Sequence, residues 1–197
     1  DRGVTVGHNC SSSVIFPDEN LEAVIRQAIN KPSGEIPKSD LQSLTELNAV
    51  GKDIKNIEGL QYCTKLDQLD LSHNQISDIS AVAGLTNLTV LDLYNNQVSD
   101  INAVAGLTNL TVLNLSKNRI SDISALAGLN NLEKLYLFGN RISDIKPLAD
   151  NIGIGSNDTV MFYSSYTEGS NPLSTTSCTV YIPQLQDRGA DVVHDCP

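Results

Sequence analysis

Leucine, isoleucine and valine return along the middle of this chain with a constant period of 22 residues. Five blocks that share the pattern begin at Leu44, Leu66, Leu88, Leu110 and Leu132. Each of the last four reads L-x-x-L-x-L-x-x-N-x-I/V-x-D-I from its first leucine. Five units in one unbroken register predict a repeat architecture, in which each unit buries its apolar side chains mainly against its neighbours.

Within a block, the alternation of apolar and polar residues predicts a short β-strand. In the second block, Leu69 and Leu71 flank Asp70, so a strand turns both leucines inward and the aspartate outward. We therefore expect parallel strands near 69–71, 91–93, 113–115 and 135–137. The later apolar positions of each block fill the core from the opposite side, as in the second block: Ile76, Ile79, Val82 and Leu85.

Two polar positions also recur in every full block. An asparagine follows each strand, and its amide can satisfy backbone groups where the strand turns away: Asn74, Asn96, Asn118 and Asn140. An aspartate precedes each expected helical turn, where it can accept hydrogen bonds from exposed backbone N–H groups: Asp78, Asp100, Asp122 and Asp144. Successive aspartates lie one strand spacing apart and each has this local role, so we assign no metal.

The segments on both sides of the blocks predict end caps, which a solenoid needs to cover its core. Upstream, Pro17 and Asp18 form a start signal for a helix within 17–30. The apolar residues of this helix share one face: Leu21, Val24, Ile25 and Ile29. Downstream lie the segments DTVMFY, NPL and CTVYIPQLQDRGADVVHDC.

The repeat unit, the upstream helix and the downstream segments together resemble bacterial internalin-like leucine-rich-repeat proteins, over essentially the whole chain. The resemblance implies an α/β solenoid of horseshoe shape, with a parallel concave β-sheet and short 3-10 or irregular helical turns on the convex side. It also implies an N-terminal cap at 11–43, five repeats at 44–153, and a closing segment of strand, helix and strand at 154–197.

This sequence departs from the family pattern in two places. In the first repeat, Lys52 replaces the recurrent asparagine and Asn56 replaces the aspartate, as expected of an edge unit. Between Tyr163 and Asn171, the stretch SSYTEGS is longer than the usual turn before the NPL triplet.

The two ends of the chain carry related sequences. DRGVTVGHNC at 1–10 matches DRGADVVHDC at 187–196 in six of ten positions, at one constant offset. Residues 1–10 are therefore expected to be the closing strand of a preceding block, which makes the chain one period of a tandem array. Alternatively, Asp1 is a true terminus whose strand pairs with a neighbouring subunit in a head-to-tail polymer.

Four cysteines allow three pairings. Cys63 takes the position filled by leucine in later repeats, so we expect it to be buried and unpaired. Cys178 and Cys196 bracket the closing helix and strand, and we expect a disulfide between them. Cys10 then pairs upstream of this sequence, although a Cys10–Cys63 bond remains the alternative if Asp1 is the terminus.

Charge and composition exclude several functions. A net charge of −10 and a pI near 4.5 disfavour nucleic acid and anionic membrane surfaces as partners. No apolar run has the length of a membrane span, so membrane insertion is not expected. His8, His73 and His194 are scattered, and no zinc spacing or phosphate-binding loop occurs. We therefore predict a non-enzymatic protein with no catalytic residue, no metal and no cofactor, located extracellularly or on a bacterial cell surface.

The outward positions of the expected strands differ between blocks, so the concave sheet is the face free to carry specificity. The candidate ligand-binding residues are Asp70, Asp92, Tyr94, Asn114, Lys134, Tyr136, Phe138 and Tyr163. Aromatic side chains on a polar sheet favour a binding hot spot for a protein or glycan ligand, although an exposed ladder could simply stiffen the sheet. The predicted function is a protein-binding or adhesion module. The alternative is a structural subunit of a surface polymer that self-associates through its end caps.

Overall fold

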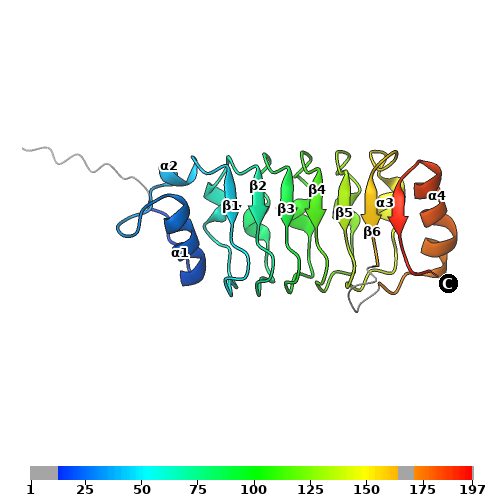
Figure 1. Cartoon of the computed structure of the whole chain (residues 1–197), viewed down its shortest axis with the longest axis horizontal. Helices are drawn as coiled ribbons and strands as arrows, with labels where there is room; N and C mark the ends of the chain where they lie inside the picture. Colours follow the sequence, from blue (N-terminus) through cyan, green and yellow to red (C-terminus); the bar gives the residue numbers. More distant parts are fainter. Residues whose placement is uncertain (1–12, 164–170, 197) are drawn as a thin grey trace, which may run out of the picture.

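Parallel strands in chain order form one open sheet in the computed structural model, which describes residues 13–163 and 171–196 (Figure 1). The strands are β1 (Glu46–Asn48), β2 (Gln68–Asp70), β3 (Val90–Asp92), β4 (Val112–Asn114), β5 (Lys134–Tyr136), β6 (Thr159–Met161) and β7 (Asp191–Val193). The predicted strand at 1–10, including Cys10, lies outside the described residues, as does the stretch SSYTEGS.

The 22-residue period sets the register of the strands. Leu69 of β2 pairs with Leu91 of β3, and the same leucine position pairs with itself across the later repeats. Each strand begins one residue before the predicted position. The pairing nevertheless continues past the strand ends, because the Leu71 N–H donates to the Asp92 carbonyl at 2.9 Å. Leu69 and Leu71 are both buried, so the predicted inward and outward directions are correct.

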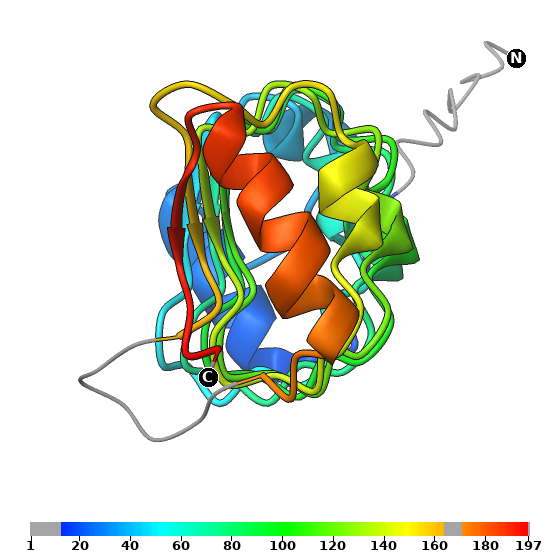
Figure 2. The same ribbon diagram turned by 90° about the vertical axis from the view of Figure 1, so that its right-hand side faces the viewer.

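Short helical turns form the layer opposite the sheet (Figure 2). Four 3-10 turns are followed by a short α-helix: η1 (Leu60–Tyr62), η2 (Ser80–Val82), η3 (Asn102–Val104), η4 (Ser124–Leu126) and α3 (Lys146–Asp150). A continuous core of leucine, isoleucine and valine lies between the two layers. This arrangement confirms the predicted leucine-rich-repeat solenoid.

The recurrent asparagines form a buried ladder beside the strands. Asn118 is typical: its Nδ2 donates to the carbonyls of Leu93 and Leu115 at 2.9 and 3.0 Å. Its Oδ1 accepts the Val98 N–H at 2.9 Å. Each asparagine thus ties the backbone of its own repeat to that of the preceding one.

Two further asparagines continue this role where the 22-residue period ends. Asn171, in the NPL triplet, accepts the Ile142 N–H at 3.1 Å and donates to the Leu137 carbonyl at 2.8 Å. Asn151 takes the position that a leucine fills in the preceding repeat, and its Nδ2 donates to the Leu126 carbonyl at 2.9 Å. Both side chains are buried. The last repeat therefore joins the closing segment through side-chain amides.

The recurrent aspartates have the predicted local role. Asp78 Oδ1 accepts the Ser80 N–H at 2.8 Å, and this bond lowers the pKa of its carboxyl. The equivalent bond recurs in the later repeats, and Asn56 makes it to the Glu58 N–H in the first. Asp78 stands two residues before Ser80, the first residue of η2, so it closes a tight bend rather than capping the helix itself.

The N-terminal cap consists of helices α1 (Glu19–Ala28) and α2 (Lys38–Leu41), and α1 lies beside β1 (Figure 1). Asp18 begins α1: its Oδ1 accepts the N–H groups of Asn20 and Leu21 at 3.0 and 3.2 Å. Its Oδ2 accepts the N–H groups of Lys55 and Asn56 at 2.7 and 3.1 Å. One carboxylate therefore both starts the cap helix and joins it to the first repeat.

We expect Asp18→Ala to lower the free energy of unfolding by about 2–3 kcal/mol at neutral pH, because it removes a helix cap and charge-assisted hydrogen bonds. Burial of Asp18 raises the pKa of its carboxyl, but the four N–H groups together hold the pKa below its ordinary value of 3.8. The native bonds are therefore present above pH 3.8 and are lost as the pH falls through the lower, folded pKa. Urea unfolding of both proteins should show the difference shrinking over that acidic range, and a constant difference would contradict the role given to the charge.

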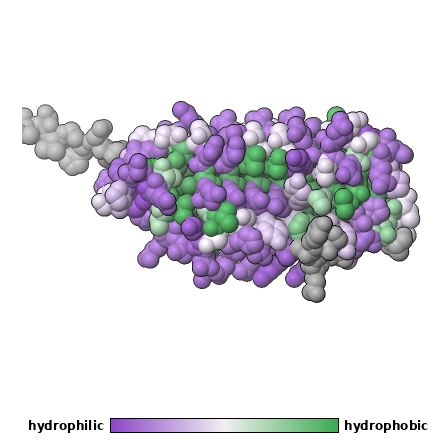
Figure 3. Space-filling model, viewed as in Figure 1, coloured by the Kyte–Doolittle hydropathy of each residue, from purple (hydrophilic) through white to green (hydrophobic). Residues whose placement is uncertain are grey.

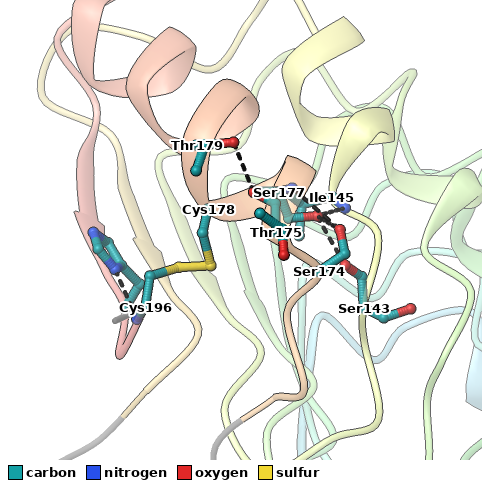
Figure 4. The surroundings of a disulfide bond; sticks show 9 residues. Ser143, Ile145, Ser174, Thr175, Ser177, Cys178, Thr179 and Cys196 are labelled. Atoms are coloured by element: carbon teal, nitrogen blue, oxygen red, sulfur yellow. Dashed lines mark hydrogen bonds between the residues drawn. A yellow bond between two sulfur atoms is a disulfide. The ribbon is translucent and has the colours of Figure 1, made fainter.

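The closing segment covers the last repeat with a π-helical turn, η5 (Ser177–Tyr181), which leads into α4 (Ile182–Asp187). Ser177 attaches it to the preceding repeat, since its Oγ donates to the Ser143 carbonyl at 2.8 Å and accepts the Ile145 N–H at 3.3 Å (Figure 4). A disulfide joins Cys178 to Cys196, which follows β7 (Figure 4). Cys63 is buried and has no disulfide partner among the described residues, and burial raises the pKa of its thiol to about 12.

Candidate binding site on the sheet

The outward side of the sheet carries the candidate residues in rows set by the strand register. One row runs across β2 to β6 as Asp70, Asp92, Asn114, Tyr136 and Met161. Lys134 lies two residues before Tyr136 on β5, level with Val112 of β4. Apolar side chains gather in a band across the middle strands, with polar side chains around them (Figure 3). This outward side is called the sheet face below.

Tyr94 is the centre of a side-chain cluster just after β3. Its ring centroid lies 6.0 Å from that of Phe138 and 4.9 Å from that of His73, which meets it edge-on. Lys117 Nζ lies 5.7 Å from the centroid of the same ring. These four residues, His73, Tyr94, Lys117 and Phe138, are the Tyr94 cluster.

Tyr94 and Phe138 meet above Ser116, which occupies the same position in the repeat between theirs. Strands two places apart are separated by roughly 9.6 Å, so the two rings must lean toward one another to come within 6.0 Å. Ser116 is fully buried, and its Oγ has no hydrogen-bond partner among the described residues. The pair is therefore a packed platform rather than two independent exposed rings.

His73 and Lys117 belong to a column of residues with left-handed backbone conformation. The column occupies one position in five successive repeats, with φ values of 63°, 58°, 55°, 53° and 67°: Gly51, His73, Asn95, Lys117 and Gly139. A left-handed conformation costs a residue with a Cβ roughly 1–2 kcal/mol, and glycine avoids this cost. His73 and Lys117 nevertheless occupy it, and both side chains contact Tyr94.

Asp92 and Asn114 support the loop that carries Tyr94. Asp92 Oδ1 accepts the Tyr94 N–H at 2.8 Å, while its Oδ2 accepts a hydrogen bond from Asn114 Nδ2 at 3.1 Å. Burial raises the pKa of the Asp92 carboxyl, and the neighbouring Asp70 charge acts in the same direction. Asp70 makes the same bend on its own strand, accepting the Ser72 N–H at 2.9 Å. The side chains of Asp70, Asp92 and Asn114 thus make hydrogen bonds within the fold. Their contact with a ligand stays a prediction.

The structure brings together only part of the predicted set. Tyr94 and Phe138 form the platform, and Asp70, Asp92 and Asn114 lie beside it. Tyr136 and Tyr163 make no ring contact with the Tyr94 cluster in the part of the chain described. The sequence pattern gave no binding role to His73 or Lys117. Their shared position in the repeat, occupied by glycine in two other units, is the signal that could have identified them.

Within residues 13–163 and 171–196, no three histidine, cysteine, aspartate or glutamate side chains come together as a metal site. No helix in the same ranges is long and apolar enough to cross a membrane.

The family model described as "Leucine Rich repeats (2 copies)" matches residues 42–84, 64–106 and 108–150, which together make up more than half of the chain. The chain therefore belongs to the leucine-rich-repeat family.

Within that family, the chain is an internalin-like protein. It is 38% identical to internalin H of Listeria monocytogenes over 77 residues, which are 38% of this chain and 14% of that protein. The crystal structure of the internalin InlF from Listeria monocytogenes matches with a TM-score of 0.71 and 27% identity, covering 91% of this chain and 56% of that one. Internalin C2 from the same organism matches with a TM-score of 0.51 and 27% identity, covering 91% and 95%. The chain thus corresponds to a small part of internalin H and to about half of InlF.

Proposed function

We propose that this chain is a non-enzymatic protein-binding module, acting outside the cell or on a bacterial surface, and that it binds through the Tyr94 cluster on the sheet face. The observation that carries the proposal is the cluster itself. Two aromatic rings from different repeats form a packed platform, and side chains held in left-handed backbone conformations surround it. Residues kept in costly conformations are concentrated at functional sites.

The platform has the physical properties of a binding hot spot. Tyrosine offers a large contact area with few rotatable bonds, so ordering it on binding costs little entropy. The ring of Tyr94 is half-buried and already fixed by three neighbours, which lowers that cost further. A partner therefore meets a preformed apolar surface.

The surroundings of the platform favour a partner with basic side chains. A groove of about 260 Å³ lies on the sheet face over β1 to β3, and its lining includes Glu46, Asp70 and Asp92. The whole chain carries a net charge of −10. A partner that presents an apolar anchor with a neighbouring lysine or arginine would complement both features. The disulfide and the internalin relatives support the extracellular placement.

A displayed library of random peptides tests this proposal without a known ligand. Peptides selected on the intact chain should be rich in apolar and basic residues, and Tyr94→Ala should weaken their binding by about 30-fold, the effect of a 2 kcal/mol hot spot. Tyr62→Ala is the matched control, because Tyr62 also lies beneath a lysine, with Lys38 Nζ 4.1 Å from its ring centroid. Selected peptides that bind both variants equally would refute a site at Tyr94. Binding to a glycan array with the same Tyr94 dependence would instead indicate a carbohydrate ligand.

Lys117→Gly separates a role in binding from a role in folding. Glycine relieves the left-handed backbone at this position, so the free energy of unfolding should rise by about 0.5–1 kcal/mol. Binding of the selected peptides should weaken, because Lys117 no longer helps to hold the Tyr94 ring in place. Denaturant unfolding and peptide titration of the same sample measure both effects. A loss of stability in Lys117→Gly would show that Lys117 serves the fold instead.

A structural subunit of a head-to-tail surface polymer is the second candidate function, and the related sequences at the two ends of the chain favour it. Sedimentation of the intact chain over a range of concentrations tests it. Assembly that grows with concentration would support a polymer, and a constant monomer would exclude it.

A further inference from the structure

Exposed large apolar side chains lie toward the two ends of the solenoid. Among the described residues they are Ile15, Ile152 and Val180, exposed by 81%, 85% and 41%. Ile15 precedes α1 in the N-terminal cap, Val180 lies in η5, and Ile152 lies in the turn between α3 and β6. The middle repeats contribute no residue to this set. The two ends of the solenoid therefore carry exposed apolar side chains that would be buried if another structure packed there.

The closing end also has a strand edge to which no described strand is paired. β7 is last in the sheet, and within residues 13–163 and 171–196 it pairs with β6 alone. In the view onto this end, α4 covers the core while β7 lies beside it with no ribbon in front (Figure 2). Unpaired edges are ready to meet a neighbouring chain. At the opposite end, α1 lies beside β1 (Figure 1).

The related end sequences limit how far apart two successive units can be. Residues 187–196 contain β7 and end at Cys196, and their counterpart at 1–10 ends at Cys10. The cap already begins at Ser13, which pairs with Pro37, and the Val14 N–H donates to the Ile36 carbonyl at 2.7 Å. Only two residues therefore separate the counterpart of Cys196 from the cap. The three steps from Cys10 to Ser13 span at most about 11 Å of extended chain.

We propose that this chain is one unit of a tandem array, in which the closing segment of each unit packs against the N-terminal cap of the next and covers Ile15. The partner that packs on the N-terminal cap is the closing segment of a preceding unit of the same kind, which is equivalent to residues 171–196 of this chain. Separate chains, each with a net charge of −10, repel one another, whereas a two-residue connection holds the ends at a high effective concentration. The short connection therefore favours the interface within a chain over the same contact between free chains.

A two-unit chain, residues 1–196 followed directly by a second copy of residues 11–196, tests this interface. The junction then repeats the natural step from Cys10 to Ser11. We expect Ile15→Ser in the second copy to lower the denaturant midpoint of the two-unit chain, since that Ile15 is covered. The same substitution in the first copy is the internal control and should leave the midpoint unchanged, because that Ile15 remains 81% exposed.

Equal effects of the two substitutions, or no effect of either, would overturn the proposed contact. Concentration-dependent assembly of the single chain that Ile15→Ser abolishes would also overturn it, because the ends would then join separate subunits. Small-angle scattering adds a second measurement. The two-unit chain should have one fixed, elongated shape, and scattering typical of two independently moving units would contradict direct packing.

Discussion

Asn118→Leu should lower the free energy of unfolding by about 3–5 kcal/mol, an unusually large loss for one substitution. Asn118 is buried in the central repeats, and its amide bonds the carbonyls of Leu93 and Leu115 and the N–H of Val98. Leucine has a similar volume, so it opens no large cavity but leaves these backbone groups without partners. Each buried unpaired group costs about 1–3 kcal/mol. Chemical denaturation followed by circular dichroism measures the loss.

Asn109→Ala is the matched control for this prediction. Asn109 also reaches across repeats, but its side chain is exposed and Nδ2 makes one bond, to the Thr86 carbonyl at 2.9 Å. Water can replace that bond, so the expected loss is below about 1 kcal/mol. If the two variants lost similar free energies of unfolding, burial of the asparagine side chain would not determine how much it contributes to stability.

Gly153→Ala should destabilise the protein by about 3 kcal/mol or more, because the new methyl group has no room. A Cβ at Gly153 would overlap the backbone of Asn130, including its carbonyl oxygen. Backbone cannot move aside as the end of a flexible side chain can. The turn that leads into β6 would have to separate from the preceding repeat, which would also disturb the bond from the Gly153 N–H to Asn151 Oδ1. The thermal midpoint and the urea midpoint should both fall.

Gly84→Ala provides the comparison, since a Cβ there meets nothing within 4 Å. Its expected effect on the free energy of unfolding is within about 0.5 kcal/mol. If Gly153→Ala were equally mild, the turn before β6 would have to be free to shift, and the close approach to Asn130 would not be a constraint on the fold.

The repeats could be predicted from sequence because each buried position recurs at the same spacing. Leu69 and Asn118 each occupy a position that recurs in successive repeats. The recurrence predicts whether the side chain points inward and which residues lie beside it, without any knowledge of distant contacts. The period stops at the closing segment, and prediction weakened there. Asn151 stands in a leucine position and Asn171 follows an irregular stretch, so neither could be assigned to the hydrogen-bonding role that the structure gives it.

For the candidate binding site, the sequence predicted the face of the sheet but not the arrangement of side chains on it. The 22-residue period places Tyr94 and Phe138 on the same side of the sheet, but it also places them two strands apart. Their contact depends on side-chain rotamers and on the small side chain of Ser116 between them. The approach of His73 depends on the left-handed turn after the strand, with φ of 58°. Neither property follows from the spacing of apolar residues.

The disulfide between Cys178 and Cys196 gives the molecule a mechanical polarity. A solenoid under tension peels from its ends, because each outer coil touches only one neighbour. At the closing end, the bond fastens the chain after β7 to the start of η5, so the last coil cannot unwind while the bond is intact. At the other end, the corresponding attachment is the set of hydrogen bonds to Asp18, which are not covalent. A steady pull on both ends should therefore unravel the chain from its N-terminal cap inward.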